Sequence, residues 1–332
     1  MFERMIWNGK SIPALGLGGW AIGGPVFGGE TNYGWGVVDD QQSAAAIAAA
    51  VDLGIRFFDT APTYGAGHSE TVLGEALRHH PHVLIGTKVG YEIDPATRQI
   101  RGADASAAAV RRGVEASLRR LQRDHIDIVH LHLNSLPVTE AEDTFAALEG
   151  LRQDGKIGAF GWSTDFPESA AAFVQMRGFV SVQHAMNVFF RATDMVETIE
   201  KNGLLSINRS PLAMGLLSGR FDASTAIPKD DIRALSLDWL SYFKDGRVSP
   251  SYLRQLESVR ELLQSGGRTL VQGAIGWLWA RSAKSLSIPG FRNKAQVIDL
   301  AGALQFGPLP PDVMAEIEAV IIREPEGPAR ER

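Results

Sequence analysis

The chain has 332 residues, 45% of them hydrophobic and 21% charged, which is typical of a folded globular protein. It has no cysteine, which excludes disulfides, thiolate nucleophiles and cysteine-ligated metals, and its formal net charge of −5 makes nucleic acid an unexpected partner. No apolar run is long enough to span a membrane, and Met1 to Met5 contain no hydrophobic export signal. We therefore expect no membrane partner and a cytoplasmic location.

Strand and helix patterns alternate along most of the chain. An Asn8-Gly9 turn between apolar residues predicts an N-terminal hairpin over residues 5–13. Eight strands are then expected, over residues 14–19, 55–59, 83–88, 126–132, 157–163, 180–185, 204–209 and 285–289. Helices are expected over residues 41–53, 69–79, 105–122, 139–153, 167–176, 194–202, 250–264, 269–281, 293–304 and 311–322.

This alternation predicts the fold class. Strands that alternate with helices pair in parallel, and eight such units fit a closed α/β barrel, the (β/α)8 TIM barrel, better than a doubly wound open sheet. A long loop segment over residues 212–248 follows the seventh strand. No Pro/Ser-rich linker divides the chain, so residues 1–332 are interpreted as a single domain, with a mobile tail over 323–332.

Polar residues end several predicted strands, which is where such barrels place functional side chains. The second to fourth strands end at Asp59, Lys88 and His132, and Tyr64 follows on the loop after Asp59. Any one of them alone is explained by a strand that meets solvent. Together they would bring a carboxylate, an ammonium, an imidazole and a phenol into one pocket.

These four groups have complementary chemistry. A phenol is a poor proton donor at pH 7, but a nearby ammonium lowers its pKa by favouring the phenolate. Lys88 can supply that charge, and Asp59 can hold Lys88 in place. Tyr64 could then protonate a carbonyl oxygen as a hydride arrives, while His132 orients the carbonyl.

With these residues the chain resembles the aldo-keto reductase family, in its bacterial type, over nearly its whole length. The matching stretches are Phe58-Asp59-Thr60-Ala61-Pro62-Thr63-Tyr64-Gly65 with Gly67-His68-Ser69-Glu70, Gly86-Thr87-Lys88, Ile126-Asp127-Ile128-Val129-His130-Leu131-His132, Gly158-Ala159-Phe160-Gly161-Trp162-Ser163, Ser210-Pro211-Leu212-Ala213-Met214-Gly215-Leu216-Leu217-Ser218-Gly219 and Ile288-Pro289-Gly290-Phe291-Arg292-Asn293. The resemblance implies NAD(P)H-dependent reduction of small aldehydes, ketones or sugars, or the reverse oxidation, without a metal. The family's catalytic four fall on Asp59, Tyr64, Lys88 and His132, and the protein is expected as a monomer or homo-oligomer.

The resemblance also implies cofactor-binding positions: Gly19, Trp20, Ser163, Thr164, Gln183, Arg209, Ser210, Leu212, Gly215, Leu217, Ser218, Arg292, Asn293 and Gln296. Ser163 and Gln183 match residues that hold the nicotinamide carboxamide. Three positions depart from the usual pattern: Thr164 replaces Asn, Arg209 replaces a Tyr that stacks on the nicotinamide, and Asp299-Leu300 replaces Glu-Asn. Arg209 could itself stack or form a hydrogen bond. The guanidinium fork of Arg292 suits a 2′-phosphate, so NADPH is preferred over NADH, which stays possible.

Several other patterns in the sequence allow different interpretations. Gly16 to Ala21 matches a loose dinucleotide fingerprint, but Pro25 follows too soon for the helix that such a motif requires. His130 and His132 could share a metal, although the sequence offers few further ligands. A regulatory or redox-sensing barrel that binds cofactor with little turnover is the alternative to an enzyme. Trp20, Trp35, Trp162 and Phe189 are expected in the substrate pocket, and further candidate walls are Phe27, Tyr33, Trp239, Tyr242 and Phe243.

Overall fold

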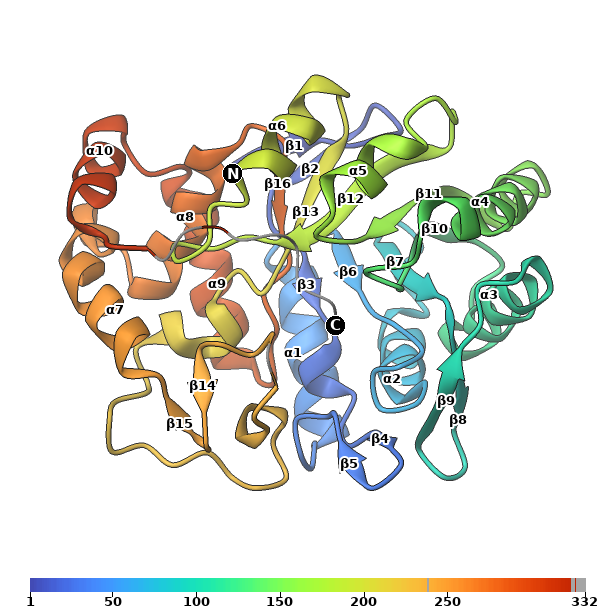
Figure 1. Ribbon diagram of the computed structural model, residues 1–332, viewed down its shortest axis with the longest axis horizontal. Helices are drawn as coiled ribbons and strands as arrows, with labels where there is room; N and C mark the ends of the chain where they lie inside the picture. Colours follow the sequence, from blue (N-terminus) through green and yellow to red (C-terminus); the bar gives the residue numbers. More distant parts are fainter. Residues whose placement is uncertain (238, 324–325, 327–332) are drawn as a thin grey trace.

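The structure is a computed structural model that describes residues 1–237, 239–323 and 326. Eight parallel strands form its central sheet: β3 (Leu17–Gly18), β6 (Phe57–Asp59), β7 (Leu84–Val89), β10 (Ile126–Leu131), β11 (Ile157–Ser163), β12 (Phe179–Ala185), β13 (Leu205–Arg209) and β16 (Ser285–Ser287). Bridges from Leu15 to Ser287 and from Gly18 to Gly290 join the first strand to the last. The predicted (β/α)8 TIM barrel is therefore confirmed (Figure 1).

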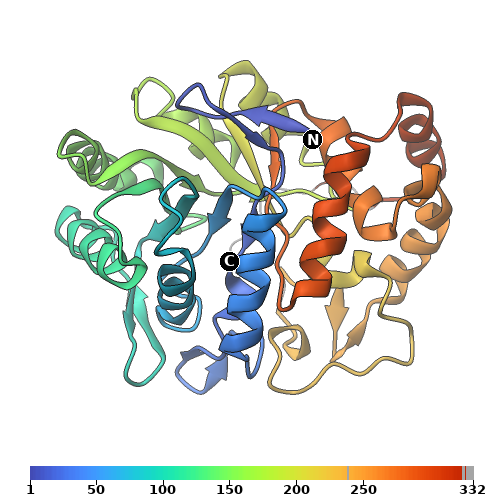
Figure 2. The ribbon, with the colours of Figure 1, turned by 180° about the vertical axis from the view of Figure 1, so that it is seen from behind.

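The helices surround this sheet. They are α1 (Asp40–Asp52), α2 (His68–Leu77), α3 (Ala107–Leu121), α4 (Val138–Gln153), α5 (Pro167–Ala172), α6 (Thr193–Lys201), α7 (Pro250–Leu263), α8 (Leu270–Arg281), α9 (Lys294–Phe306) and α10 (Pro311–Val320). Side-chain caps fix several N-termini, for example Asp39 on α1 and Asn293 on α9. Figure 2 shows α1 beside α9, so the helical ring closes where the sheet does. Within the described residues, no helix combines the length and apolar character needed to cross a membrane.

Alternate residues of each strand face opposite sides of the sheet. Ile128, Ala159 and Ile207 fill the barrel interior, whereas Phe160 and Trp162 face the helices. Trp162 is fully buried, lies 5.4 Å from Phe145 between ring centroids, and donates its indole N–H to the Leu133 carbonyl at 2.9 Å. Its assignment to the substrate pocket was wrong, because Ser163, its neighbour on the same strand, takes the inward position.

Small sheets cover the two ends of the barrel. At the N-terminal end, β1 (Glu3–Met5) and β2 (Ser11–Pro13) form the expected hairpin with a longer turn than predicted. The sequence interpretation missed the sheet of β4 (Phe27–Gly28), β5 (Thr31–Asn32), β8 (Tyr91–Asp94) and β9 (Gln99–Ala103), and the hairpin of β14 (Phe243–Lys244) and β15 (Arg247–Val248). These missed strands lie at the opposite end, which is the lower side of Figure 1.

Two further expectations concern single segments. The Gly16 to Ala21 motif ends in a three-residue 3-10 helix, η1 (Trp20–Ile22), after a barrel strand, and is therefore not a dinucleotide-binding turn. Of the tail expected to be mobile, residues 324–325 and 327–332 lie outside the described residues. The Arg323 side chain donates to the Val188 carbonyl at 2.8 Å, and the Glu326 carboxylate accepts the Arg191 and Thr193 backbone N–H groups.

Candidate active site

A buried ion pair lies at the C-terminal ends of β6 and β7. Lys88 Nζ lies 2.7 Å from Asp59 Oδ2 and donates to the Thr60 carbonyl at 2.8 Å. Gln183 Nε2 donates to the other Asp59 oxygen at 2.7 Å. Burial lowers the pKa of Lys88, but the Asp59 carboxylate and the Tyr64 side chain outweigh it and leave the pKa above its ordinary value. Lys88 is therefore a fixed positive charge.

Tyr64 stands over this pair on the loop between β6 and α2. Lys88 Nζ lies 4.9 Å from the centroid of its ring. The loop passes so close to Gly23 that a Cβ on Gly65, whose φ is +67°, would lie 1.8 Å from the Gly23 carbonyl oxygen. Burial raises the pKa of the Tyr64 phenol, and the Lys88 charge opposes that rise without reversing it. The expected net lowering is therefore not found, and Tyr64 keeps its proton.

His132, the residue after β10, completes the group. Its ring centroid lies 6.1 Å from that of Tyr64, and the two rings are nearly perpendicular at 85°. Burial and, next, the Lys88 and Arg209 charges lower the pKa of His132 well below its ordinary value, so the imidazole is neutral. The ring centroid of Tyr91, on β8, lies 5.8 Å from that of His132. Sequence reasoning missed Tyr91, although apolar Tyr91 and Ile93 before Asp94-Pro95 are a hairpin signal.

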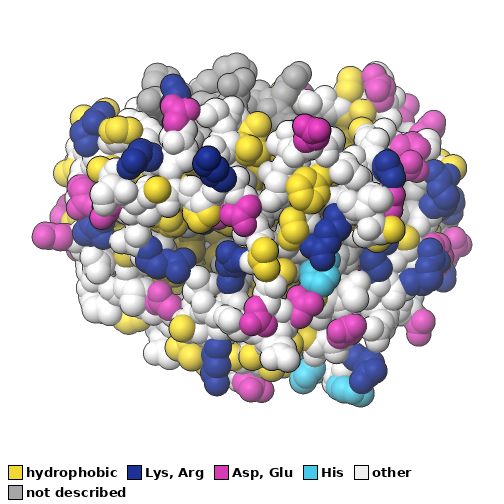
Figure 3. Space-filling view, turned by 90° about the horizontal axis from the view of Figure 1, so that it is seen from below, with side chains coloured by type: hydrophobic (Ala, Val, Ile, Leu, Met, Phe, Trp, Pro, Cys, Tyr) yellow, Lys and Arg dark blue, Asp and Glu magenta, His cyan; other side chains and the backbone are white. Residues whose placement is uncertain are grey.

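Three tryptophans form an aromatic wall beside Tyr64. Trp20 stacks on Tyr64 at 5.9 Å and 21°, and it contacts Trp35 at 5.4 Å and Trp239 at 6.5 Å. Trp20 and Trp35 thus lie where the substrate pocket was expected. Phe189 does not join this wall but packs against Tyr242 and Tyr252, which corrects its assignment to the pocket. Figure 3 views this end of the barrel and shows a hollow with hydrophobic side chains inside it and basic side chains at its edge.

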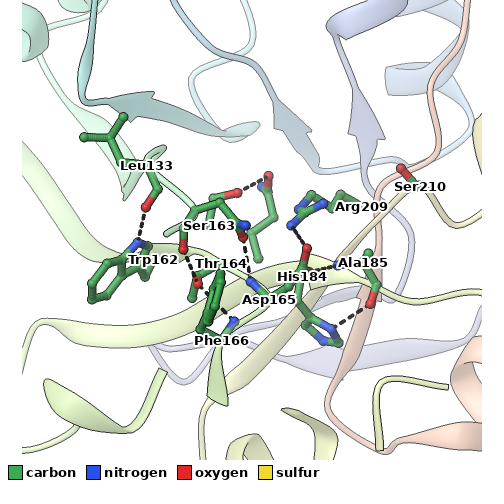
Figure 4. Close-up of polar contacts among 12 residues, drawn as sticks. Leu133, Trp162, Ser163, Thr164, Asp165, Phe166, His184, Ala185, Arg209 and Ser210 are labelled. Atoms are coloured by element: carbon green, nitrogen blue, oxygen red, sulfur yellow. Dashed lines mark hydrogen bonds and ion pairs between the residues drawn. The ribbon is translucent and has the colours of Figure 1, made fainter. Parts of the chain in front are cut away.

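A second ion pair lies where β11 and β13 end. Arg209 Nη2 lies 2.7 Å from Asp165 Oδ2, and Asp165 Oδ1 accepts the Ala185 backbone N–H at 2.9 Å (Figure 4). Ser163 Oγ donates to Gln183 Oε1 at 3.4 Å, which links this side to Asp59. Asp165 was not singled out from the sequence, because it lies two residues beyond the strand end.

Thr164 is the cofactor position that the structure does not support. Its side chain is fully buried, and its hydroxyl donates to the Asn134 carbonyl at 2.7 Å and accepts the Phe166 N–H at 3.1 Å. Because both contacts are internal, the hydroxyl fixes the loop after β11 rather than facing a ligand. Leu300 is buried in the core face of α9.

An arginine-rich cavity of about 480 Å³ lies between the N-terminal ends of α1 and α9. Its lining includes Arg220, Arg233, Arg292, Asn293 and Gln296. The last three were expected at the adenosine end of a cofactor, but Arg220 and Arg233 were not. Asp231 holds Arg233 through two hydrogen bonds, at 2.7 and 2.9 Å, and the guanidinium lies 4.8 Å from the Trp35 ring. The cavity therefore adjoins the aromatic wall.

The segment expected to pass a pyrophosphate connects these two regions. It contains the 3-10 helix η2 (Ala213–Ser218) and carries Ser210, Leu212, Gly215, Leu217 and Ser218. Positive φ angles occur at Ser210, Ala213, Met214 and Gly215. Leu217 is fully buried, so its side chain packs in the core.

His130 lies on β10, two residues before His132, and its side chain faces the barrel interior. It is fully buried, and its Nε2 lies 2.8 Å from Ser181 Oγ. Burial lowers its pKa to about 3. Across the described residues, no group of three or more His, Asp or Glu side chains is arranged to hold a metal ion.

The barrel and this site together define a class of protein: oxidoreductases that reduce carbonyl groups with NAD(P)H. A sequence profile of the Aldo/keto reductase family matches residues 14–322, and the chain belongs to that family. It is 29% identical to the aldo-keto reductase YhdN of Bacillus subtilis, over 87% of this chain and 84% of that one.

Two solved structures are similar throughout. The glycerol dehydrogenase AKR11B4 from Gluconobacter oxydans is 28% identical, with a TM-score of 0.80, and 99% of each chain is covered. An aldo-keto reductase from Klebsiella pneumoniae in complex with NADPH is 25% identical, with a TM-score of 0.70 and 98% of each chain covered. Both agree with an NAD(P)H-dependent carbonyl reductase.

Proposed function

We propose that the protein reduces small aldehydes and ketones, including hydroxylated ones, with NADPH, and that it can run the reverse oxidation. The observation that carries this proposal is Tyr64 held directly above the buried Lys88–Asp59 pair, with a neutral His132 beside it. A protonated phenol over a fixed ammonium is a proton donor whose conjugate base is already stabilised.

Each of the four side chains has a separate role in this proposal. Tyr64 donates its proton to the carbonyl oxygen, and Lys88 stabilises the phenolate that remains. Asp59 fixes Lys88 and cancels part of the cost of its burial. Neutral His132 positions the carbonyl oxygen without competing as an acid. The bound nicotinamide supplies the hydride, and no metal is assigned because Lys88 provides the charge.

The cofactor positions fit this chemistry. Arg209 has a buried guanidinium nitrogen, Nη1, without a hydrogen-bond partner among the described residues, at the end of β13 where a nicotinamide would lie. Ser163 and Gln183, linked to Asp59, would hold its carboxamide. The arginines of the 480 Å³ cavity would hold phosphate groups, with Arg292 on the 2′-phosphate. The NADPH complex of the Klebsiella pneumoniae relative supports NADPH over NADH.

The substrate class follows from the aromatic wall. Indole faces suit small carbonyl compounds and the C–H faces of sugars, and similarity to a glycerol dehydrogenase supports hydroxylated substrates. A cytoplasmic protein that acts as a monomer or homo-oligomer completes the proposal.

A cofactor-oxidation screen tests it. Purified protein is mixed with aldehydes, ketones and aldoses, with NADPH and NADH in turn, and loss of the reduced cofactor is followed by absorbance. Turnover with NADPH and at least one carbonyl compound is expected. Tight NADPH binding with negligible turnover across the panel would instead favour the regulatory or redox-sensing barrel.

A further inference from the structure

The Arg209–Asp165 pair is held rigidly from the protein side. Both side chains are largely buried, at 15% and 9% exposure. Asp165 accepts the Ala185 N–H at 2.9 Å, and its own backbone N–H donates to Asn134 Oδ1 at 2.8 Å. Ala185, at the end of β12, therefore fixes the carboxylate, Asn134 fixes the Asp165 backbone, and the carboxylate fixes Arg209 (Figure 4).

Arg209 is nevertheless incompletely paired. Its Nη2 contacts Asp165, but Nη1 is buried and has no hydrogen-bond partner within the part of the chain that the structure describes. A buried donor without a partner is costly unless a ligand meets it. Burial raises the pKa of Tyr64, and the Arg209 charge opposes part of that rise; burial lowers the pKa of His132, and the Arg209 charge adds to that lowering, so Arg209 acts at the reacting centre.

Hydride transfer places strict limits on where the nicotinamide can lie. Its reactive carbon must come within about 3–3.5 Å of a carbonyl carbon whose oxygen meets Tyr64. The nicotinamide must therefore lie within reach of the same Arg209 charge. Its ring is cationic when oxidised and neutral when reduced, so nearby fixed charges act on one form far more than on the other.

We infer that the Arg209–Asp165 pair sets the relative affinity of the site for the oxidised and reduced nicotinamide cofactor. The Arg209 guanidinium disfavours the cationic oxidised ring, and the Asp165 carboxylate limits that bias. The inference rests on the proposed function, because it requires NADP(H) to bind beside Tyr64. It gives Arg209 a role beyond stacking on a flat ring.

Binding measurements separate the two charges. Dissociation constants for NADP⁺ and NADPH are determined by quenching of tryptophan fluorescence for the unsubstituted protein, Arg209→Met and Asp165→Asn. Arg209→Met should shift the affinity ratio toward NADP⁺ by about tenfold, which lowers the potential of the bound couple by about 30 mV. Asp165→Asn keeps an acceptor for the Ala185 N–H but loses the negative charge, so it should shift the ratio away from NADP⁺ by a similar factor.

Arg209→Lys is the matched control, because it keeps the positive charge and should leave the ratio within about twofold. A purely structural role would weaken both forms equally in every variant, and that result would overturn the inference. Shifts of the same sign in Arg209→Met and Asp165→Asn would overturn it too. If Asp165→Asn does not fold, the contrast between Arg209→Met and Arg209→Lys still decides. Failure of the unsubstituted protein to bind either form would overturn the proposed function together with the inference, whereas tight binding with unchanged ratios would overturn the inference alone.

Discussion

Two buried pairs of a cation and a carboxylate lie at the C-terminal end of the barrel strands. Lys88–Asp59 and Arg209–Asp165 both have a nitrogen–oxygen distance of 2.7 Å. In the first pair, Lys88 also donates to Thr60 and Asp59 also accepts from Gln183, so the protein itself completes the pair. In the second, Arg209 Nη1 stays without a partner among the described residues. We call Lys88–Asp59 the closed pair and Arg209–Asp165 the open pair. The closed pair holds a charge for the protein's own Tyr64, whereas the open pair presents a charge to a ligand.

The largest expected effect comes from Tyr64→Phe, which leaves both pairs intact and removes only the proton donor. We expect kcat/KM for carbonyl reduction to fall by about 10²–10⁴-fold, the usual contribution of a positioned acid. NADPH binding should be unchanged, because the arginine-rich cavity and Arg209 are untouched. Steady-state kinetics with a fluorescence titration measure the two quantities. An active Tyr64→Phe enzyme would contradict the proposed mechanism.

Lys88→Met breaks the closed pair and leaves the Asp59 carboxylate buried without a counter-charge. The protein should lose about 3–5 kcal/mol of stability, as buried pairs do when one partner is removed. Loss of the ammonium also removes the largest of the effects that oppose burial at Tyr64, so the phenol pKa rises further and the pH–rate profile moves to higher pH.

Urea denaturation of Lys88→Met and Arg209→Met compares the two pairs directly. Arg209→Met should cost less stability, because Asp165 keeps its backbone partner and the pair is less deeply buried than Lys88–Asp59. Equal losses in the two variants would contradict the distinction between a closed and an open pair, and an unchanged pH–rate profile in Lys88→Met would remove Lys88 as the group that tunes Tyr64.

Both residues of the closed pair could be predicted from the sequence. Of the open pair, only Arg209 could be. Asp59 and Lys88 end apolar runs, and the strand period alone places such residues at the barrel mouth. Arg209 follows from the same rule, but Asp165 lies in a loop whose path depends on Asn134, more than 30 residues away, as the bond from Asp165 N to Asn134 Oδ1 shows. No local pattern in the sequence specifies such a contact.

Two other differences have equally definite causes. Trp162 was assigned to the pocket because its ring is aromatic. Successive residues of a strand point to opposite faces, so the inward position of Ser163 on β11 turns Trp162 toward the helices. Arg233 lies in the long segment after β13, where its position depends on Asp231 and on stacking with Trp35. Tertiary packing decides such positions, so the cavity it lines was only partly foreseen.

Arg292→Ala probes the cofactor region furthest from both pairs. Arg292 lines the 480 Å³ cavity, so the variant should bind NADPH about tenfold to a hundredfold more weakly and NADH almost unchanged. Lys284→Ala is the control: it removes the same charge from an exposed site at the opposite end of β16. Equal losses for NADPH and NADH in Arg292→Ala would exclude Arg292 from the 2′-phosphate site.

The last expected effect concerns His184, which supports the open pair through Ala185. Its Nδ1 donates to the carbonyl of Ala185, whose N–H holds Asp165, and its Nε2 lies 2.7 Å from Ser206 Oγ. Burial lowers its pKa from 6.5 to about 4. Below pH 6.5 the unfolded chain therefore binds a proton that the folded chain does not. The resulting stability is complete above pH 6.5 and is lost as the pH falls toward 4, by at most about 1.4 kcal/mol per pH unit.

His184→Asn should flatten this part of the stability profile, measured by urea unfolding between pH 7 and 4. Buried His130, with a pKa of about 3, contributes a similar slope that the variant leaves in place. His79→Asn, at an exposed position of the same residue type, is the control and should leave the slope unchanged. If the slope of His184→Asn equals that of the unsubstituted protein, His184 is not held neutral by the fold. The open pair would then have a titrating neighbour at the pH of the reaction, and the cofactor affinity ratio would itself change with pH.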